Sequence, residues 1–138
     1  MRRLAPLLGV SLLLAGCGGE RTVLPIAETV IGTVPTTTQA SVPAGNAKVG
    51  ATLFKAQGCG GCHVFKPAGT NGKIGPDLDN LAKYAQQANQ GPLATFAFDS
   101  IKNPSAYIQP GFQNVMPNFG QTLSDKQIAD LVAYLTKG

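Results

Sequence analysis

The clearest pattern of apolar and polar positions lies near the end of the chain. Four apolar residues there recur at the i, i+3, i+4, i+7 spacing of one helix face: Ile128, Leu131, Val132 and Leu135. Just before them, Ser124 and Gln127 stand three residues apart, which is the spacing of a capping box. The pattern predicts a closing helix that begins after Ser124 and buries one face.

An earlier helix is predicted from Asn46, a good N-cap residue, to about Gln57, and Gly58 should stop it. The stretch 64–75 is rich in Gly, Pro, Asn and Lys, which predicts a loop. No strand pattern competes within this part of the chain. The first half of the folded region is therefore expected to be a helix followed by a long loop.

Two further helices are predicted between this loop and the closing helix. The first should start at Asp77 or Asp79, end near Gln87 and present three apolar residues on one face: Leu78, Leu81 and Ala85. The second should open with Pro92 at its first position and end before Pro104. It should bury Leu93, Phe96, Ala97 and Ile101. The pattern predicts an all-α domain of about four helices over residues 46–138.

The start of the chain has the pattern of an export signal. A short positive segment precedes an apolar run over residues 4–14, and Leu14-Ala15-Gly16-Cys17 resembles a bacterial lipobox. A membrane-spanning helix is the alternative, but the run is shorter than the roughly 20 residues needed to cross a bilayer. We therefore expect residues 1–16 to be a lipoprotein signal peptide. The resemblance implies that Cys17 is lipidated and holds the protein at the membrane.

Residues 17–45 are expected to be a flexible linker behind this anchor. They are rich in Gly, Thr, Pro, Ala and Val, carry few charges and show no sustained helical or strand period. A strand over residues 29–34 is the alternative, but no partner strand is evident. A coil of the 28 residues that follow Cys17 would reach roughly 30 Å, enough for a folded domain to move across a neighbour in the membrane.

Charge argues against nucleic acid as a partner. The formal net charge is +4, but two of the positive charges, on Arg2 and Arg3, lie in the segment expected to be removed. No helix gathers Lys and Arg with interleaved aromatic residues. The mature protein is therefore only weakly basic, and its partners are expected to be proteins and a membrane.

The chemistry of the chain centres on Cys59-Gly60-Gly61-Cys62-His63. Two thiols separated by two residues, and followed at once by a histidine, form the attachment signature of a c-type haem. The thiols can add to the haem vinyl groups, and His63 then lies below the iron as its proximal ligand. A zinc site would need four ligands, yet the chain holds one histidine and only one further cysteine, Cys17. All three cysteines then have roles, and no disulfide is expected.

Met116 is the candidate for the second iron ligand. It is the one methionine besides Met1, and it lies in a loop rich in Gly, Asn and Pro rather than on an apolar helix face. Thioether sulfur is a soft ligand that raises the potential of a haem iron. A core methionine that fills a gap is the alternative, but the loop and the adjacent Pro117 favour the ligand.

Over residues 46–138 these features resemble the class I cytochromes c, a family with one covalently attached haem c and His/Met ligation. The resemblance rests on the haem motif, Met116-Pro117, the segment Ile74-Gly75-Pro76-Asp77-Leu78 and the closing helix. It implies that the Pro76 carbonyl accepts a hydrogen bond from His63. It also implies that the first and last helices cross at Gly50, Phe54 and Tyr134.

Within that family, residues 99–138 look most similar to cytochrome c domains that feed haem-copper oxidases. The resemblance implies a lipid-anchored electron carrier on the outer face of a bacterial cytoplasmic membrane, not an enzyme with a small-molecule substrate. It would carry single electrons from a quinol-oxidising complex to a terminal oxidase. Two alternatives stay open: a fixed subunit of a larger redox complex such as a dehydrogenase, or a five-coordinate haem that senses gas or reacts with peroxide.

Several other residues have two possible roles. Tyr107 could hydrogen-bond a haem propionate or be a partly buried structural tyrosine. Phe112 and Phe119 flank Met116 and are expected to form walls of the haem pocket. Three lysines near the motif could attract an acidic partner or simply cover a solvated surface: Lys55, Lys66 and Lys73.

Overall fold

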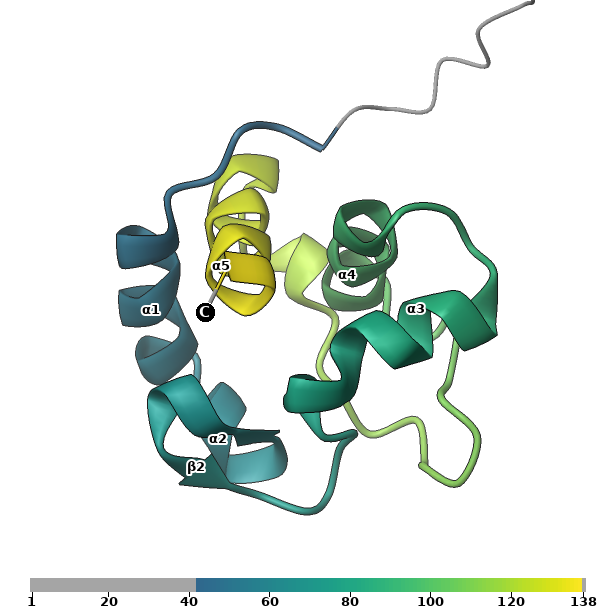
Figure 1. Cartoon of the computed structure of the whole chain (residues 1–138). Coiled ribbons are helices and arrows are strands. Elements are labelled where there is room, and N and C mark those ends of the chain that lie inside the picture. The colour runs from purple at the N-terminus through teal and green to yellow at the C-terminus, as the bar shows by residue number, and fades with distance from the viewer. Residues whose placement is uncertain (1–41, 138) are drawn as a thin grey trace, which may run out of the picture. The chain divides into compact units, whose positions relative to one another are not determined.

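The computed structural model describes residues 42–137 (Figure 1). The expected signal peptide, the lipidation site Cys17 and the linker as far as residue 41 lie outside the described residues. Within the described range the structure is mainly helical, which confirms the predicted all-α class. Its α-helices are α1 (Ala47–Ala56), α2 (Cys59–Cys62), α3 (Leu81–Ala88), α4 (Leu93–Lys102) and α5 (Asp125–Lys137). None of the described helices is both long and apolar enough to span a bilayer.

Helix α1 begins and ends as its sequence predicts. The Asn46 side chain accepts hydrogen bonds from the backbone N–H groups of Lys48, at 2.9 Å, and Val49, at 3.3 Å, and so caps the first turn. The helix ends before Gly58, whose φ of 69° lies in the left-handed region that favours glycine. The chain turns there and enters the haem motif directly.

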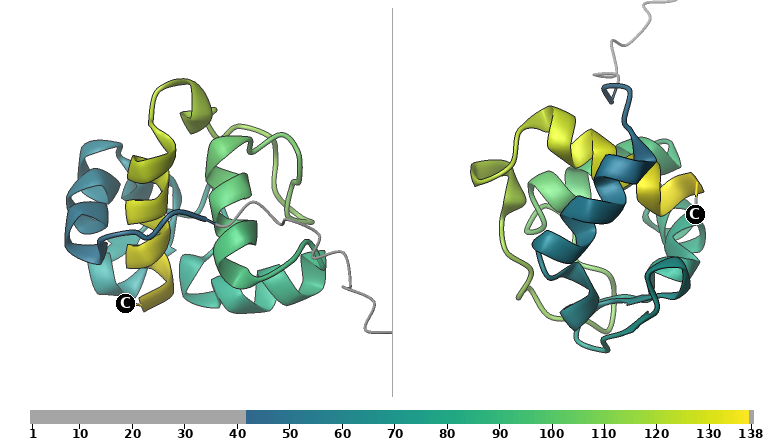
Figure 2. Two further views of the ribbon diagram at one scale, coloured as in Figure 1. Left: turned by 90° about the horizontal axis from the view of Figure 1, so that it is seen from above. Right: turned by 90° about the vertical axis from the view of Figure 1, so that its left-hand side faces the viewer.

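Helix α5 crosses α1 at close range (Figures 1 and 2). A Cβ atom added at Gly50 would lie only 1.9 Å from the backbone oxygen of Asp130, so glycine permits the approach. Beside this contact, the rings of Phe54 and Tyr134 meet edge to face with centroids 5.7 Å apart. The crossing is the one that the family resemblance implies for Gly50, Phe54 and Tyr134.

The capping box at the start of α5 is present. The backbone N–H of Ser124 donates to Gln127 Oε1 at 2.9 Å, and the backbone N–H of Gln127 donates to Ser124 Oγ at 3.3 Å. The predicted apolar face then packs into the core. Ile128, Leu131 and Val132 are buried, and Leu135 is partly buried.

The region after the haem motif contains short strands that the sequence analysis missed. Strand β1 (Val64–Phe65) pairs antiparallel with β2 (Thr70–Asn71), and a 3₁₀ turn, η1 (Lys66–Ala68), links them. The expectation of a plain loop over 64–75 was therefore wrong. Strands of two residues are too short to show an alternating pattern. A hydrogen bond that Thr70 Oγ1 donates to the His63 carbonyl, 2.9 Å long, supports the pairing.

The two middle helices form close to their predicted positions. The first begins with a 3₁₀ turn, η2 (Leu78–Asn80), which Asp77 caps, and continues as α3. Pro92 lies at the N-cap of α4 rather than at its first helical position. Phe98, which was not among the expected core residues, is buried beneath the Lys102 ammonium, whose nitrogen lies 5.4 Å from the ring centroid.

Packing against the core begins a few residues before α1. Val42 is partly buried against the core, and a Cβ atom at Gly45 would lie 1.9 Å from the backbone oxygen of Ala129. The core itself lies between α1, α3, α4 and α5, with Phe54 and Ile128 as its largest fully buried side chains. A further 3₁₀ turn, η3 (Phe119–Gln121), closes the loop that leads into α5.

Candidate haem site

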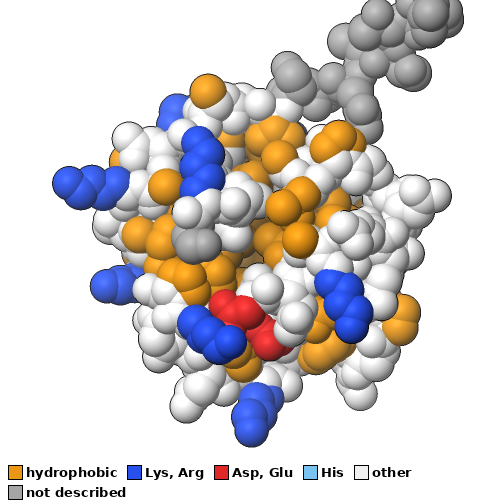
Figure 3. Space-filling view, in the orientation of Figure 1, with side chains coloured by type: hydrophobic (Ala, Val, Ile, Leu, Met, Phe, Trp, Pro, Cys, Tyr) orange, Lys and Arg blue, Asp and Glu red, His pale blue; other side chains and the backbone are white. Residues whose placement is uncertain are grey.

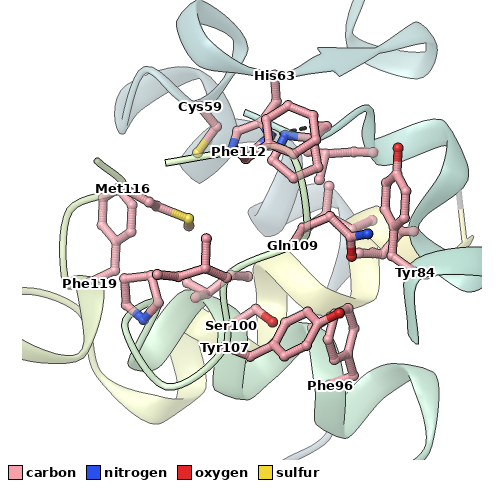
Figure 4. Close-up of a pocket in the computed structure, with 18 of the residues that line it drawn as sticks. Cys59, His63, Tyr84, Phe96, Ser100, Tyr107, Gln109, Phe112, Met116 and Phe119 are labelled. Atoms are coloured by element: carbon pink, nitrogen blue, oxygen red, sulfur yellow. Dashed lines mark hydrogen bonds between the residues drawn. The ribbon is translucent and has the colours of Figure 1, made fainter. Parts of the chain in front are cut away.

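One pocket collects the residues that the sequence analysis singled out. It is lined mainly by apolar side chains from α1, α3, α4, α5 and the loop before η3 (Figure 4). Five of the six predicted haem-site residues in the described range line it: Cys59, His63, Pro76, Tyr107 and Met116. The sixth, Cys62, lies one helical turn from Cys59 in α2 and is not among the lining residues.

Helix α2 positions the two thiols of the motif. It is a single turn with Cys59 at its start and Cys62 at its end, and both cysteines are partly buried and not in a disulfide. The sequence analysis did not assign this turn, because Cys-Gly-Gly-Cys carries no helical pattern. Burial, with a smaller contribution from nearby Cys62, raises the pKa of the Cys59 thiol. The Cys59 thiol therefore stays protonated more readily than an exposed one, and it lies at one wall of the pocket.

His63 is held in one orientation by the loop that follows β2. Its side chain is nearly buried, and Nδ1 lies 2.7 Å from the Pro76 carbonyl oxygen, to which it can donate a hydrogen bond. Gly75 lies against the ring, because a Cβ atom there would be 2.4 Å from His63 Cε1. With Nδ1 donating, Nε2 is left as the ring nitrogen that can bind a metal.

Met116 reaches the same pocket from the loop before η3. It is partly buried, and Phe112 and Phe119, which flank it in sequence, also line the pocket. Figure 4 shows the thioether directed into the pocket. A hydrogen bond from Asn114 Nδ2 to Ser105 Oγ, 3.1 Å long, joins two parts of this loop. The fold thus brings an imidazole and a thioether, 53 positions apart in sequence, to one cavity.

A set of polar side chains lines another part of the pocket. Tyr107 packs edge to face on Phe96, with centroids 5.6 Å apart, and this contact gives it a structural role whatever else it binds. The sequence analysis missed Tyr84, Ser100 and Gln109, which also line the pocket. Of these three, only Tyr84 could have been found from the sequence, since it lies three positions after Leu81 and so near the same face of α3.

Gln109 carries the one orphaned polar atom found among the described buried side chains. Its Oε1 is buried and has no hydrogen-bond partner there. Leaving such an atom unpaired costs about 1–3 kcal/mol, so a partner from outside the described residues is expected.

These features fit a haem. The pocket offers apolar walls for a porphyrin, a nitrogen and a sulfur ligand for its iron, and free thiols beside it for its vinyl groups. No group of three or more His, Cys, Asp or Glu side chains gathers within the described residues.

Comparison with known proteins agrees with this geometry. The sequence model of the family described as Cytochrome c matches residues 47–138, which includes the haem motif, Met116 and α5. The chain belongs to the cytochrome c family. The family binds a covalently attached haem c and transfers electrons through it.

Two relatives show how far the similarity extends. The chain is 34% identical to cytochrome c of Guizotia abyssinica over 109 residues, which cover 70% of this chain and 93% of the relative. It is 33% identical to cytochrome c of Gossypium barbadense over 106 residues, or 67% of this chain and 90% of the relative. The similarity thus spans nearly the whole length of each relative.

The charges near the haem motif are dispersed. Lys66 pairs with Asp79, with 3.8 Å between Nζ and Oδ2, while Lys55 and Lys73 are exposed. Figure 3 shows lysine side chains scattered around one face, with apolar side chains gathered nearer its centre. As in other members of the cytochrome c family, redox partner proteins are expected.

Proposed function

We propose that this cytochrome c family member is a one-electron carrier with a single six-coordinate haem. In this proposal Cys59 and Cys62 would hold the haem through thioether bonds, and His63 Nε2 and Met116 Sδ would be the protein ligands of its iron. The observation that carries the proposal is that His63, oriented by the Pro76 carbonyl at 2.7 Å, and Met116 line one apolar pocket.

The proposed ligand set favours electron transfer over catalysis. When bound, the haem supplies an iron that changes between Fe(III) and Fe(II) by one electron. His63 and Met116 would supply both protein ligands of the iron, which would leave no ligand position for a substrate. Phe112 and Phe119 would exclude water from Met116, and the bond to Pro76 would keep His63 from turning. A rigid and dry pocket keeps the structural change between the two oxidation states small.

The cellular setting follows from the segment ahead of the domain. We infer that Cys17 is lipidated and that the carrier works on the outer face of a bacterial cytoplasmic membrane. The supporting observations are the positive and apolar leader, the lipobox-like Leu14-Ala15-Gly16-Cys17 and the low-charge linker. A methionine ligand raises the potential, which suits transfer from a quinol-oxidising complex to a terminal oxidase.

A visible spectrum of the oxidised and reduced protein, with and without Met116→Ala, tests the ligation. The wild type should show a low-spin haem c and the weak methionine-to-iron charge-transfer band, and it should bind carbon monoxide slowly. Met116→Ala should lose the band, bind carbon monoxide rapidly and have a lower midpoint potential. Rapid carbon monoxide binding by the wild type, without the band, would instead support the five-coordinate sensor or peroxidase.

A further inference from the structure

Gln109 lines the pocket and has a buried polar atom that the proposed iron ligation does not explain. Its Oε1 is buried and has no hydrogen-bond partner among the described residues. A buried amide without a partner is unfavourable, and the loop that carries Gln109 also carries Met116 and lines the pocket. The missing partner is therefore expected to be a polar group of whatever fills the pocket.

The haem provides such a group. Besides its vinyl groups a haem carries two propionate carboxylates, on the half of the ring away from the vinyls. Figure 4 shows Gln109 on the side of the pocket that carries Tyr84, with Cys59 and Met116 on the other side. A haem joined to Cys59 would thus direct its carboxylates towards the part of the pocket where the amide lies.

A carboxylate needs a donor, and the amide can supply one. A half-turn about the last side-chain bond of Gln109 exchanges Oε1 with the Nε2 group, which has two N–H donors. Among the described residues that line the pocket, none is Lys, Arg, Asp or Glu. The titratable lining groups are Cys59, His63, Tyr84 and Tyr107. A propionate in this pocket therefore has neutral donors, not cations, as its neighbours.

We propose that the Gln109 side-chain amide donates a hydrogen bond to a haem propionate and thereby raises the reduction potential of the iron. Gln109 is a positioning residue: it touches the edge of the cofactor and not the iron. An ionised propionate favours Fe(III), because its negative charge lies near the metal. A hydrogen bond disperses that charge and so relatively favours Fe(II). The proposal rests on the haem ligation proposed above.

The variant Gln109→Leu tests this role in the full-length, haem-loaded protein. Leucine removes the donor at similar size, so the midpoint potential at fixed pH should shift downward while the methionine charge-transfer band stays. Gln87→Leu is the matched control, because Gln87 is an exposed glutamine on α3 that does not line the pocket. Its potential should equal that of the wild type. An unchanged midpoint potential in Gln109→Leu, with the band present, would overturn the proposal. It would indicate that the Gln109 amide hydrogen-bonds to water and not to a propionate.

Two measurements separate this role from general packing. The propionate bending bands in the resonance Raman spectrum should shift in Gln109→Leu and not in Gln87→Leu; identical bands would contradict the proposal. If Gln109→Leu loses the methionine band, the test uses Gln109→Glu instead, because glutamate keeps the size of the side chain. Two facing carboxyl groups cannot both ionise easily, so the midpoint potential should gain a pH dependence that the wild type lacks in that range. Its absence would contradict the contact.

The outcome for Gln109 is distinguishable from the outcome for the proposed function. A wild-type protein without the His/Met spectrum would contradict the ligation itself. A normal wild-type spectrum, with neither the potential nor the Raman bands sensitive to residue 109, would contradict only the role of Gln109.

Discussion

At the scale of single residues, the environment of His63 depends on two backbone positions. The Pro76 carbonyl accepts from Nδ1 at 2.7 Å, and Gly75 leaves room for the ring, since a Cβ atom there would lie 2.4 Å from Cε1. Real Cβ contacts are essentially never so short. The orientation of the imidazole therefore rests on glycine at one position and on a carbonyl at the next.

Gly75→Ala should disturb this arrangement. The new methyl group must displace either the ring or the loop, so we expect a loss of about 1–3 kcal/mol in the free energy of unfolding and a change in midpoint potential. Denaturant unfolding and redox titration of the haem-loaded protein measure the two effects. Lys73→Ala is the control, because Lys73 is an exposed residue of the same loop. Equal behaviour of the two variants would show that the ring is not confined by Gly75.

Residue types were enough to find part of this site. Cys59, Cys62 and His63 are a local motif, and Met116 stood out because the chain has so few methionines. The role of Pro76 came from the family resemblance. Gln109 could not be found in this way, because a glutamine in a loop has no pattern, and its buried, unpaired oxygen exists only once the pocket has formed.

At the scale of elements, α5 is tied to the start of α1 through Asp130. This nearly buried carboxylate accepts a hydrogen bond from the Asn46 backbone N–H at 2.6 Å and pairs with Lys126 on its own helix. The hydrogen bond from Lys126 lowers the pKa of Asp130, burial opposes this, and the bond from Asn46 lowers it further. The folded state therefore prefers the ionised form.

Asp130→Asn should remove a pH-dependent part of the stability. Because the folded pKa is depressed, the contribution of Asp130 is fully present above the unfolded pKa of about 3.9 and is lost as pH falls through the folded pKa. The variant should be less stable than the wild type at neutral pH, and the difference should shrink in acid. Unfolding free energies measured against pH test this. Asp99→Asn, at an exposed position, is the control, and a constant difference across the pH range would contradict the role of Asp130.

Most helices could be predicted from local patterns, whereas the strands could not. The N-cap at Asn46 and the capping box of Ser124 and Gln127 lie next to the chain segments that they stabilise. Strands β1 and β2 have two residues each, and they pair as a hairpin across the 3₁₀ turn η1. Strands this short leave no alternating pattern in the sequence.

At the scale of the whole molecule, the proposed lipid on Cys17 would hold the haem domain at a membrane through the linker. Cys17→Ser should move the protein from the membrane fraction to the soluble fraction after export, because serine offers no thiol for a lipid. The haem spectrum should stay that of the wild type, since residues 42–137 are unchanged. Fractionation of cells and absorption spectra measure the two properties. A Cys17→Ser protein that stays in the membrane fraction would show that something other than this lipid holds it there.

The haem motif, the candidate second ligand, the helical class and the approximate helix positions could all be predicted from the sequence. Each depends on residue type or on spacing within a few turns of chain. Tertiary packing was needed to show that His63 and Met116 share one pocket, that Gly50 lets α1 approach α5, and that Gln109 Oε1 is buried without a partner among the described residues. Such contacts join segments far apart in the chain, and they arise only when burial of the apolar faces packs the helices together.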